Sequence, residues 1–524
     1  MVNHGVSRAC GTCRKRRKKC DETKPICKRC ADSGRACVGY RDESALYFRH
    51  YYVPPKVLPT EESPPSTSAE AEESAEKSIL AAFRRDFVVE SADRKVSRGF
   101  LDGMPELLAA AGPLSELGQA VSIVETAVLG NQQGRLDMID DAARRYCSLL
   151  RSFQTTLFRR ETHVNIQTLM TALLLGLYEI VSSNGSSVPK HVAHVRGVCA
   201  ILLSNESPFD MAGGLQLFRL GNPLLLKGSL LEQTSHGVLC VPTSHDIIQN
   251  LDAVLVRCNP LFKRAKTILE DASSTSYELE GLLQASLDIH WAFNRWVQRQ
   301  SEEWMPKTVH TIGEMTAFSS PHPFCWPGPV DTYLDLYVSA VWNTYRKTHV
   351  MLLEILRHTA RRLSPNQETS VPMALPFDKL AQELTAALVA SIPFHLAPSL
   401  SEYIYAITTD EDIPPGRPVG GLLLLHPLYV VGRCSIVPPS VRAYVGRCLA
   451  YIGQCMGIGQ AALLAEAVRL EEASDRPLLW DEGNIDLPFQ QMTEGHILIF
   501  AGMLLQPAQV DAMGHEGCPP GPEV

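Results

Sequence analysis

Residues 10–37 read CGTCRKRRKKCDETKPICKRCADSGRAC, and this stretch decides how the N-terminal part of the chain folds. One pattern, CxxC followed after six residues by a third cysteine, occurs in it twice. The six cysteines are Cys10, Cys13, Cys20, Cys27, Cys30 and Cys37. Structural zinc prefers a tetrahedron of four ligands, so two separate ions would need eight sulfurs. Two cysteines must therefore bridge both ions, and symmetry selects Cys10 and Cys27, the first of each repeat.

Basic residues dominate the same stretch. Six thiolates and two zinc ions leave a charge of -2, which would repel phosphate if nothing offset it. Between Cys10 and Cys37 there are ten Lys and Arg against three Asp and Glu, so the metal-loaded stretch is net +5. Six of the cations form one run: Arg14, Lys15, Arg16, Arg17, Lys18 and Lys19. We expect the metal to hold this run on a short helix, and the run also fits a nuclear import signal.

The net charge of the whole chain does not reveal this basic stretch. Its 524 residues suggest two to four domains, and the net charge is -8. Residues 1–50 hold 13 Lys and Arg against 5 Asp and Glu, whereas the rest of the chain holds 36 against 52. This asymmetry is typical of a basic arm for a polyanion attached to an acidic body. The N-terminus lacks the apolar core of a secretory signal, so we expect metal binding and not disulfides.

Composition divides the chain into four segments. Residues 1–40 form the basic cysteine module, and residues 41–78 form a linker rich in Pro, Ser and Glu, which buries little apolar surface. Residues 79–505 place apolar side chains at helical spacing, and residues 506–524 form a disordered tail without periodicity. The predicted fold is a small module of two short helices around two metals, joined by a disordered linker to a large all-α domain.

Two segments show the helical spacing most clearly. Apolar residues from Leu169 to Ile180 line one helical face, and the polar stretch 182–185 then stops the helix. Apolar residues from Val441 to Ile452 repeat the spacing, and a second helical pattern follows over 460–472 after a break at 456–459. We expect these last two helices to pack together. No apolar stretch reaches the roughly 18 residues that cross a bilayer, so no membrane span is predicted.

The cysteine module resembles the fungal binuclear zinc cluster (Zn2Cys6) transcription factors. All six cysteine spacings match, and the basic residues after the second cysteine and Pro25 between the halves fall where the family places them. The resemblance implies two Zn²⁺ ions per chain. It assigns Cys10, Cys13, Cys20 and the shared Cys27 to one ion, and Cys27, Cys30, Cys37 and the shared Cys10 to the other.

The resemblance also implies how the module meets double-stranded DNA. In this family the first helix enters the major groove at a CGG-like triplet, with the residue matching Arg17 at the base edges. A guanidinium suits guanine because it can donate to both O6 and N7. The other candidate DNA-binding residues are Arg14 and Arg16 beside it, and for phosphates Lys15, Lys18, Lys19, Lys28 and Arg29.

The body has a looser resemblance to the helical regulatory domain of such factors, the fungal-specific transcription factor domain. It rests on residues 172–179, 194–197, 426–429 and 452–461. The resemblance implies a nuclear regulator of RNA polymerase II transcription, which we expect to activate a metabolic or secondary-metabolite gene cluster. Transcription machinery or coactivators are expected partners, and a homodimer and a small-molecule effector remain open. Prolines at 54–65 interrupt a coiled coil, so at most a short helix over 70–87 is expected.

Other patterns in the body indicate less. Gly457-x-Gly459-x-x-Ala462 fits a dinucleotide fingerprint, but a helical pattern precedes it where a strand is required. His191 and His194 with Cys199 could bind a metal, although such histidines more often belong to a core or a surface. Residues 471–489 mix acids with large apolar residues as activation segments and ordinary loops both do.

Two alternatives to a DNA-binding regulator stay open at this stage. One is an enzyme in the body with a DNA-targeting head; because the chain has no Walker loop, HExxH or GxSxG motif, we do not expect it to be an enzyme. The main alternative for the cysteine module is a zinc-dependent interaction module that binds protein or RNA without reading DNA sequence.

Overall fold

The computed structural model describes residues 11–37, 68–158, 165–183, 194–198, 246–364 and 375–470. Positions 17, 22, 24–26, 36, 94–95 and 195–196 are excepted. The chain forms two compact units, Met1–Thr67 and Ser68–Val524. Several expectations lie outside the described residues: those for Cys10, Arg17, His191, Cys199, the linker up to residue 67, the activation segment at 471–489 and the tail at 506–524.

The described part of the first unit contains two short helices. They are α1 (Gly11–Lys15) and α2 (Lys28–Asp32). Each begins directly after the first cysteine of one CxxC repeat, as the duplicated pattern predicts. Among the described residues of this unit, the buried side chains are those of Cys13, Cys27 and Cys30. Sulfur atoms therefore lie at the centre of the part that the structure describes.

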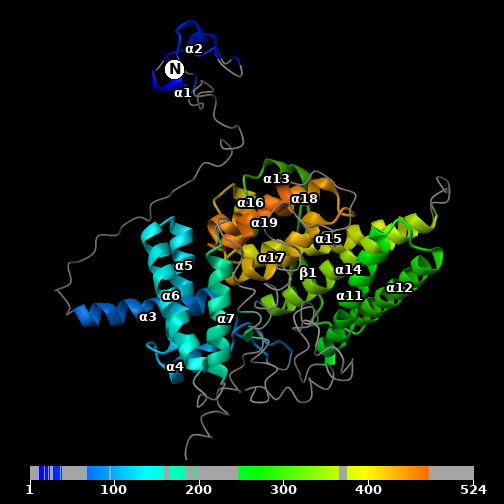
Figure 1. Ribbon diagram of the computed structural model, residues 1–524, viewed down its shortest axis with the longest axis horizontal. Helices are drawn as coiled ribbons and strands as arrows, with labels where there is room; N and C mark the ends of the chain where they lie inside the picture. Colours follow the sequence, from blue (N-terminus) through cyan, green and yellow to red (C-terminus); the bar gives the residue numbers. More distant parts are fainter. Residues whose placement is uncertain are drawn as a thin grey trace, which may run out of the picture. The chain divides into compact units, whose positions relative to one another are not determined.

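The second unit starts with a group of helices around α5. The group consists of α3 (Ser68–Phe87), α4 (Met104–Ala111), α5 (Glu116–Gln133), α6 (Leu136–Phe158) and α7 (Ile166–Val181). Helix α5 packs against α3, α6 and α7 (Figure 1). Asn165 caps the start of α7 by accepting from the amide of Thr168, and Ser182 ends it. The helix predicted from the spacing of residues 169–180 is confirmed.

The rest of the second unit is built around one long helix. Its helices are α11 (Asp246–Glu270), α12 (Ser276–Gln298), α13 (Glu314–Ser319), α14 (Leu336–Leu363), α15 (Leu375–Leu396), α16 (Leu400–Thr409), α17 (Pro418–Arg433), α18 (Pro439–Cys455) and α19 (Gly459–Leu470). Helix α14 spans 28 residues and contacts α11, α12, α15 and α17 (Figure 1). A capping box of Thr275 and Glu278 starts α12. The mainly helical body predicted from the sequence is confirmed.

A small sheet corrects the expectation that the body has no strands. Strand β1 (Lys307–Ile312) pairs antiparallel with β2 (Gly328–Thr332), with an irregularity between Thr308 and His310. Four of the six residues of β1 are β-branched, namely Thr308, Val309, Thr311 and Ile312, which favours a strand. The segment is too short and too exposed to show the alternation of a half-buried strand, so a search for helical spacing misses it.

The helices α18 and α19 form the packed pair predicted at 441–472. Gly457 between them has φ +76°, and a Cβ there would lie 2.6 Å from the carbonyl oxygen of Val128. Only glycine fits this turn. Because helix α18 and not a strand precedes Gly457, the dinucleotide fingerprint lacks its βαβ context.

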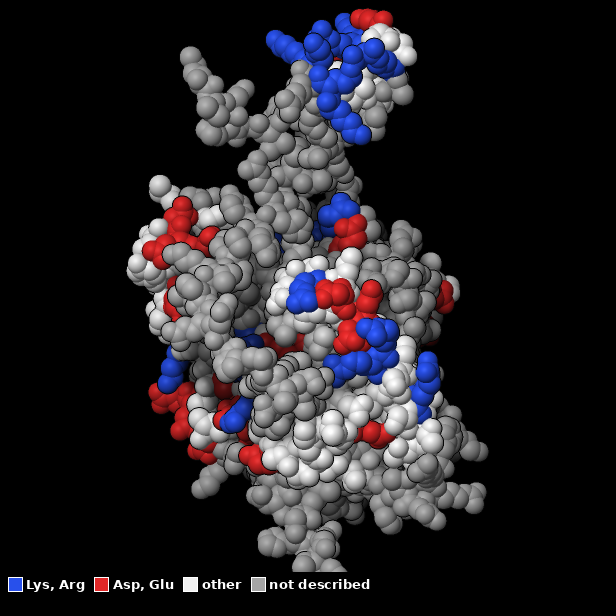
Figure 2. Space-filling view, turned by 90° about the vertical axis from the view of Figure 1, so that its left-hand side faces the viewer, with Lys and Arg blue, Asp and Glu red and all other residues white. Residues whose placement is uncertain are grey.

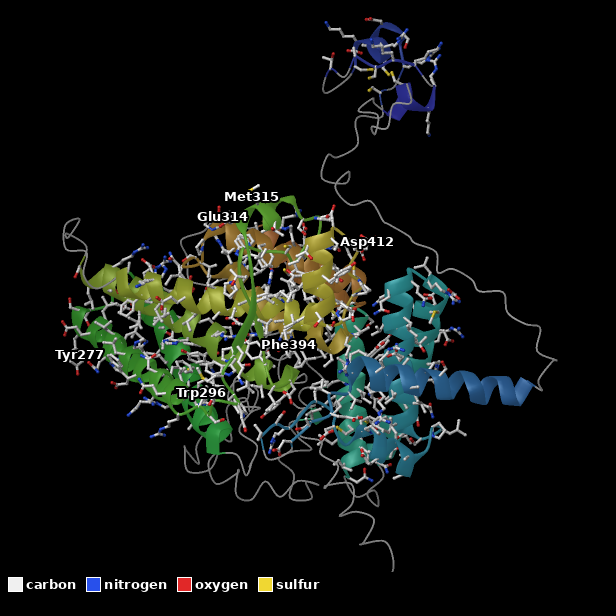
Figure 3. The ribbon with its side chains drawn as sticks, turned by 180° about the vertical axis from the view of Figure 1, so that it is seen from behind. Tyr277, Trp296, Glu314, Met315, Phe394 and Asp412 are labelled. Atoms are coloured by element: carbon white, nitrogen blue, oxygen red, sulfur yellow. The ribbon has the colours of Figure 1, made fainter. Side chains whose placement is uncertain are left out.

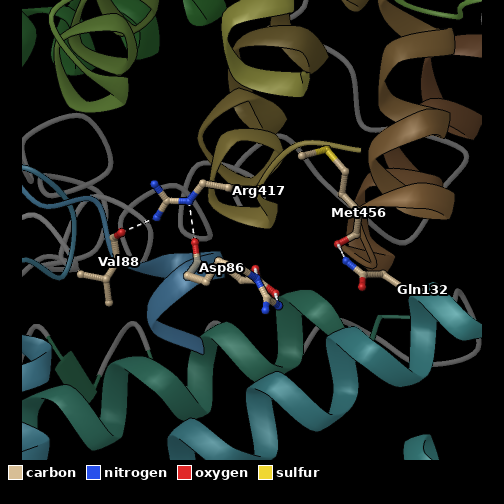
Figure 4. Close-up of polar contacts among 6 residues, drawn as sticks. Asp86, Val88, Gln132, Arg417 and Met456 are labelled. Carbon is tan, nitrogen blue, oxygen red and sulfur yellow. Dashed lines mark hydrogen bonds and ion pairs between the residues drawn. The ribbon is translucent and has the colours of Figure 1, made fainter. Parts of the chain in front are cut away.

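Helix α3 is anchored in the body by its last turns. Phe83 and Phe87 are fully buried there. The Arg417 guanidinium, at the start of α17, donates to the carbonyl oxygen of Arg85 at 2.6 Å and to that of Val88 (Figure 4). The predicted short helix over 70–87 therefore exists, but its C-terminal part belongs to the folded body.

The described helices differ from a membrane span in length or in apolarity. No single one is long and apolar enough to cross a bilayer. The bent pair of α15 and α16 reaches that length and composition together, with an angle of 97° between its helices. Helix α15 packs against α14 and α17, so its apolar residues serve the protein core.

Candidate zinc cluster and nucleic-acid interface

Five of the six predicted cysteine ligands are described, and they converge at the centre of the first unit. The sulfurs of Cys13, Cys20 and Cys27 lie within 4.8 Å of one another, and so do those of Cys27, Cys30 and Cys37. Cys27 belongs to both groups. The sequence predicts Cys10 and Cys27 as the two bridging ligands. Cys27 is the member of this pair that the structure describes, and its sulfur is shared by both groups.

The sulfur spacing suits tetrahedral zinc. With a zinc–sulfur bond of about 2.3 Å, two sulfurs of one tetrahedron lie roughly 3.8 Å apart. The Cys13 and Cys27 sulfurs, which are assigned to the same ion, are 3.8 Å apart. Thiolates of this number and spacing fit zinc and not a hard, oxygen-preferring cation such as magnesium.

Local sequence places the second group of sulfurs. Cys27 is the N-cap of α2 in extended conformation, and its sulfur accepts from the amide of Cys30 at 3.3 Å. The Asp21 carboxylate also lies at this end of the helix and accepts from the amides of Lys28 at 3.0 Å and Arg29 at 3.3 Å. A carboxylate at a helix N-terminus is stabilised by the exposed amides and the helix dipole. The hydroxyl of Thr23 donates to Asp21 as well.

These hydrogen bonds hold the pKa of Asp21 well below its usual range, the bond from the Thr23 hydroxyl contributing most. Asp21 follows the third cysteine, so its bonds tie the end of the first repeat to the start of the second. Sequence reasoning missed this role. The only sequence signal is a short acidic residue seven positions before the helix, which does not by itself indicate a cap.

Arg29 provides a second tie between the repeats. Its guanidinium donates to the carbonyl oxygen of Lys19 at 2.9 Å. The carbonyl oxygen of Arg29 accepts from the Ser33 hydroxyl at 2.7 Å. Arg29 thus has an internal contact in addition to the DNA contact that the sequence predicts for it.

The basic side chains face solvent. Lys15, Arg16, Lys18, Lys19, Lys28 and Arg29 are all exposed. Figure 2 shows Lys and Arg covering much of the described surface of the first unit, with few acidic side chains between them. One hollow of about 550 Å³ brings together Lys19, Lys28 and Arg29, which come from both repeats. Arg14 lies in α1 with its side chain outside the described atoms, and Arg17 is outside them altogether.

Comparison with known proteins agrees with this geometry. Residues 8–46 match the fungal Zn(2)-Cys(6) binuclear cluster domain. Transcription factor dbaG of Emericella nidulans is 33% identical over 399 residues, which cover 76% of this chain and 92% of that protein. The chain belongs to the fungal Zn(2)-Cys(6) transcription factors. As a member of this family it binds two zinc ions and DNA, and it regulates transcription.

Two further relatives resemble only the zinc module of this family member. White-opaque regulator 2 of Candida albicans is 60% identical over 46 residues, 9% of this chain and 10% of that protein. Transcriptional regulatory protein moc3 of Schizosaccharomyces pombe is 56% identical over 36 residues, 7% of each chain. No solved structure matches the chain. The similarity to dbaG is therefore the one of these that extends into the helical body.

One predicted metal candidate in the body is partly described. His194 lies beside α6, where its Nε2 is 2.9 Å from the Tyr146 hydroxyl. The same hydroxyl donates to the Glu179 carboxylate at 2.6 Å. His191 and Cys199, the other two members of the candidate, lie outside the described residues. The described member of this candidate, His194, forms a hydrogen bond with Tyr146 at the edge of the core.

Proposed function

We propose that the protein is a sequence-specific activator of RNA polymerase II transcription that reads a CGG-like triplet in the major groove. The observation that supports this proposal is the pair of cysteine groups sharing Cys27, from which exposed cations project. Metal at the centre would fix α1 and the residues after it as one rigid element. A rigid helix with arginines at its end is suited to reading base edges.

Individual residues take different roles in this proposal. Cys10, Cys13, Cys20, Cys27, Cys30 and Cys37 bind the two ions. Arg17 reads guanine, with Arg14 and Arg16 beside it, while Lys15, Lys18, Lys19, Lys28 and Arg29 contact phosphates. Lys19, Lys28 and Arg29 line one hollow together with Asp21 and Asp32, and the excess of cations supports a shared phosphate contact for these three.

The helical body supplies regulation in this proposal and has no enzymatic activity. It controls the zinc module and binds coactivators or the transcription machinery. The similarity to a transcription factor over most of its length supports a regulatory role for the body. We further propose that the protein acts in the nucleus, imported through residues 14–19, and that it controls a metabolic or secondary-metabolite gene cluster.

The test uses the full chain and short duplexes with and without a CGG triplet. Arg17→Ala should lower affinity for the CGG duplex by about 1–3 kcal/mol and abolish most of its preference over the other duplex. Lys28→Gln is the matched control, because it removes one cation from a phosphate contact. It should weaken both duplexes equally and reduce the salt slope by about one.

Equal loss on every duplex after Arg17→Ala would contradict sequence reading. If in addition the wild-type chain bound single-stranded RNA or an acidic protein as tightly as DNA, the module would be a general zinc-dependent binding module.

A further inference from the structure

A surface hollow of about 710 Å³ lies in the body where α11 and α12 meet α14. Such a volume is within the range of small-molecule sites. The consecutive helices α11 and α12 and the later helix α14 supply its described lining, which includes Arg257, Asp288, Trp291, Asn294, Arg295 and Tyr345. The hollow belongs to the second unit.

Its aromatic side chains offer a flat surface. Trp291 is 59% exposed, so its indole ring is accessible from solvent. Tyr345 is nearly buried and lies in a cluster of rings, with centroid distances of 5.5 Å to Phe293 and 5.2 Å to Trp296. The cluster holds Tyr345 rigidly, so the hollow has a fixed aromatic wall and an accessible indole.

The charged side chains of the hollow favour an anion. Neither Arg257 nor Arg295 forms an ion pair with another residue that the structure describes. The described lining contains one carboxylate, that of Asp288, and it accepts from the Gln284 amide at 3.0 Å. Two guanidinium groups and one carboxylate give the hollow a net positive charge. A guanidinium group binds a carboxylate through paired hydrogen bonds.

A chain of hydrogen bonds that ends at Tyr345 provides a third hydrogen-bond donor, the Tyr345 hydroxyl. Asn294 Nδ2 is 3.1 Å from His290 Nε2, His290 Nδ1 is 2.8 Å from His349 Nε2, and His349 Nδ1 is 3.3 Å from the Tyr345 hydroxyl. Burial lowers the pKa of His290, and it lowers the pKa of His349 to about 3, so both rings are neutral. A neutral imidazole has one donor and one acceptor nitrogen.

The Asn294 amide sets the direction of this chain. Because its Nδ2 donates to His290 Nε2, the opposite nitrogen of His290 donates to His349, and His349 Nδ1 donates to the Tyr345 oxygen. The Tyr345 hydroxyl proton is then left to donate elsewhere, from the wall of the hollow. Burial also raises the pKa of Tyr345 to about 12, so this proton is retained at neutral pH.

We propose that the hollow binds a planar aromatic carboxylate. Its ring stacks on Trp291, and its carboxylate accepts hydrogen bonds from Arg257, Arg295 and the Tyr345 hydroxyl. Such a ligand contacts α11 through Arg257, and it contacts α12 and the central helix α14, which the Asn294 to Tyr345 chain already joins. That this site regulates transcription rests on the proposed function, in which the body controls the zinc module.

The test is calorimetric titration of the full zinc-loaded chain with three probes. Naphthoate has both the ring and the charge, naphthalenemethanol has the ring alone, and cyclohexanecarboxylate has the charge alone. We expect naphthoate to bind once per chain, and the other two probes to bind at least about tenfold more weakly, the value of one charge-assisted contact. Absence of naphthoate binding at millimolar concentration, or equal binding of all three probes, would overturn the proposal.

Substitutions of lining residues test whether naphthoate binds in this hollow, and each has a matched control outside the hollow. Arg295→Gln and Trp291→Ala should each weaken naphthoate binding about tenfold. Arg299→Gln removes the same charge at the end of α12 from a residue outside the hollow, and Tyr277→Ala removes another exposed ring. Tyr277 lies at the opposite end of α12 from Trp296 (Figure 3), so both controls should bind as the wild type does.

Arg17→Ala separates this proposal from the proposed function. A chain that loses DNA discrimination through Arg17→Ala should still bind naphthoate normally. If Arg295→Gln and Trp291→Ala bind naphthoate as tightly as the wild type, the ligand occupies another place and the proposal is wrong, whatever the DNA measurements show.

Discussion

The sulfur of Cys27 lies 3.8 Å from that of Cys13, a residue fourteen positions away, and it also belongs to the group formed with Cys30 and Cys37. A ligand shared by two ions affects both of them when it is lost. We therefore predict that Cys27→Ser lowers the zinc content from two ions towards none and abolishes DNA binding. Elemental analysis of the purified chain measures this directly.

Cys147→Ser is the control for that variant. Cys147 is an exposed cysteine of α6 in the second unit, so its loss should leave two zinc ions and full DNA affinity. A Cys27→Ser chain that keeps one tightly held zinc ion and its DNA affinity would contradict a shared ligand.

Asp21 should control how firmly the module holds its metal. Asp21→Ala removes the carboxylate that accepts from the amides of Lys28 and Arg29, so the second repeat should open more readily. We expect faster zinc transfer to a chelator, measured with a colorimetric indicator. Asp32→Ala removes the same charge from an exposed position at the end of α2 and should have little effect. Equal acceleration by both variants would mean that charge and not the cap matters.

Glu125 should make the stability of the body depend on pH. It is fully buried beside Asp86, and burial followed by the Asp86 charge raises its pKa to about 8, from the usual 4.5. Between these values the folded chain keeps a proton that the unfolded chain has released. The Glu125 contribution to the free energy of unfolding is therefore complete below about pH 4.5 and is lost as pH rises to about 8, by up to about 1.4 kcal/mol per pH unit.

Glu125→Gln tests this relation, because an amide can donate to Asp86 at every pH. The variant should gain stability over the wild type as pH rises from 5 to 8, in urea unfolding followed by circular dichroism. A difference between the two proteins that does not change with pH would show that Glu125 is already ionised in the folded chain.

Arg417 should stabilise the attachment of α3. Arg417→Gln removes donors to the carbonyl oxygens of Arg85 and Val88 and leaves partly buried acceptors unsatisfied, at a cost of about 1–3 kcal/mol. Hydrogen exchange should show loss of protection in the last turns of α3 before the rest of the body. Arg299→Gln, an exposed residue at the end of α12, is the control and should exchange as the wild type does.

The parts of the structure that follow from local rules were predictable from sequence. Six cysteines at fixed spacing restrict the chain to one way of surrounding two ions, so the module needs no other information. Helices such as α7 and α18 show their apolar face directly in the spacing of residues. Gly457 indicates the turn between α18 and α19 because no other residue fits there.

The parts that depend on distant contacts were not predictable. Asp21 and Arg29 tie the two repeats together through backbone groups, which no residue pattern reveals. The residues of the hollow come from positions 257 to 345 and have no shared motif. Strand β1 has β-branched residues that favour a strand, but they do not reveal that β2, sixteen or more residues later, pairs with it.

X-ray absorption at the zinc edge of the full chain tests the central claim most directly, because it reports both the ligand atoms and a neighbouring metal. We predict two zinc ions per chain, each with four sulfur ligands at about 2.3 Å and with the second zinc within about 4 Å. One zinc per chain, nitrogen or oxygen among the ligands, or two zinc ions without a metal neighbour would contradict a cluster in which cysteines are shared.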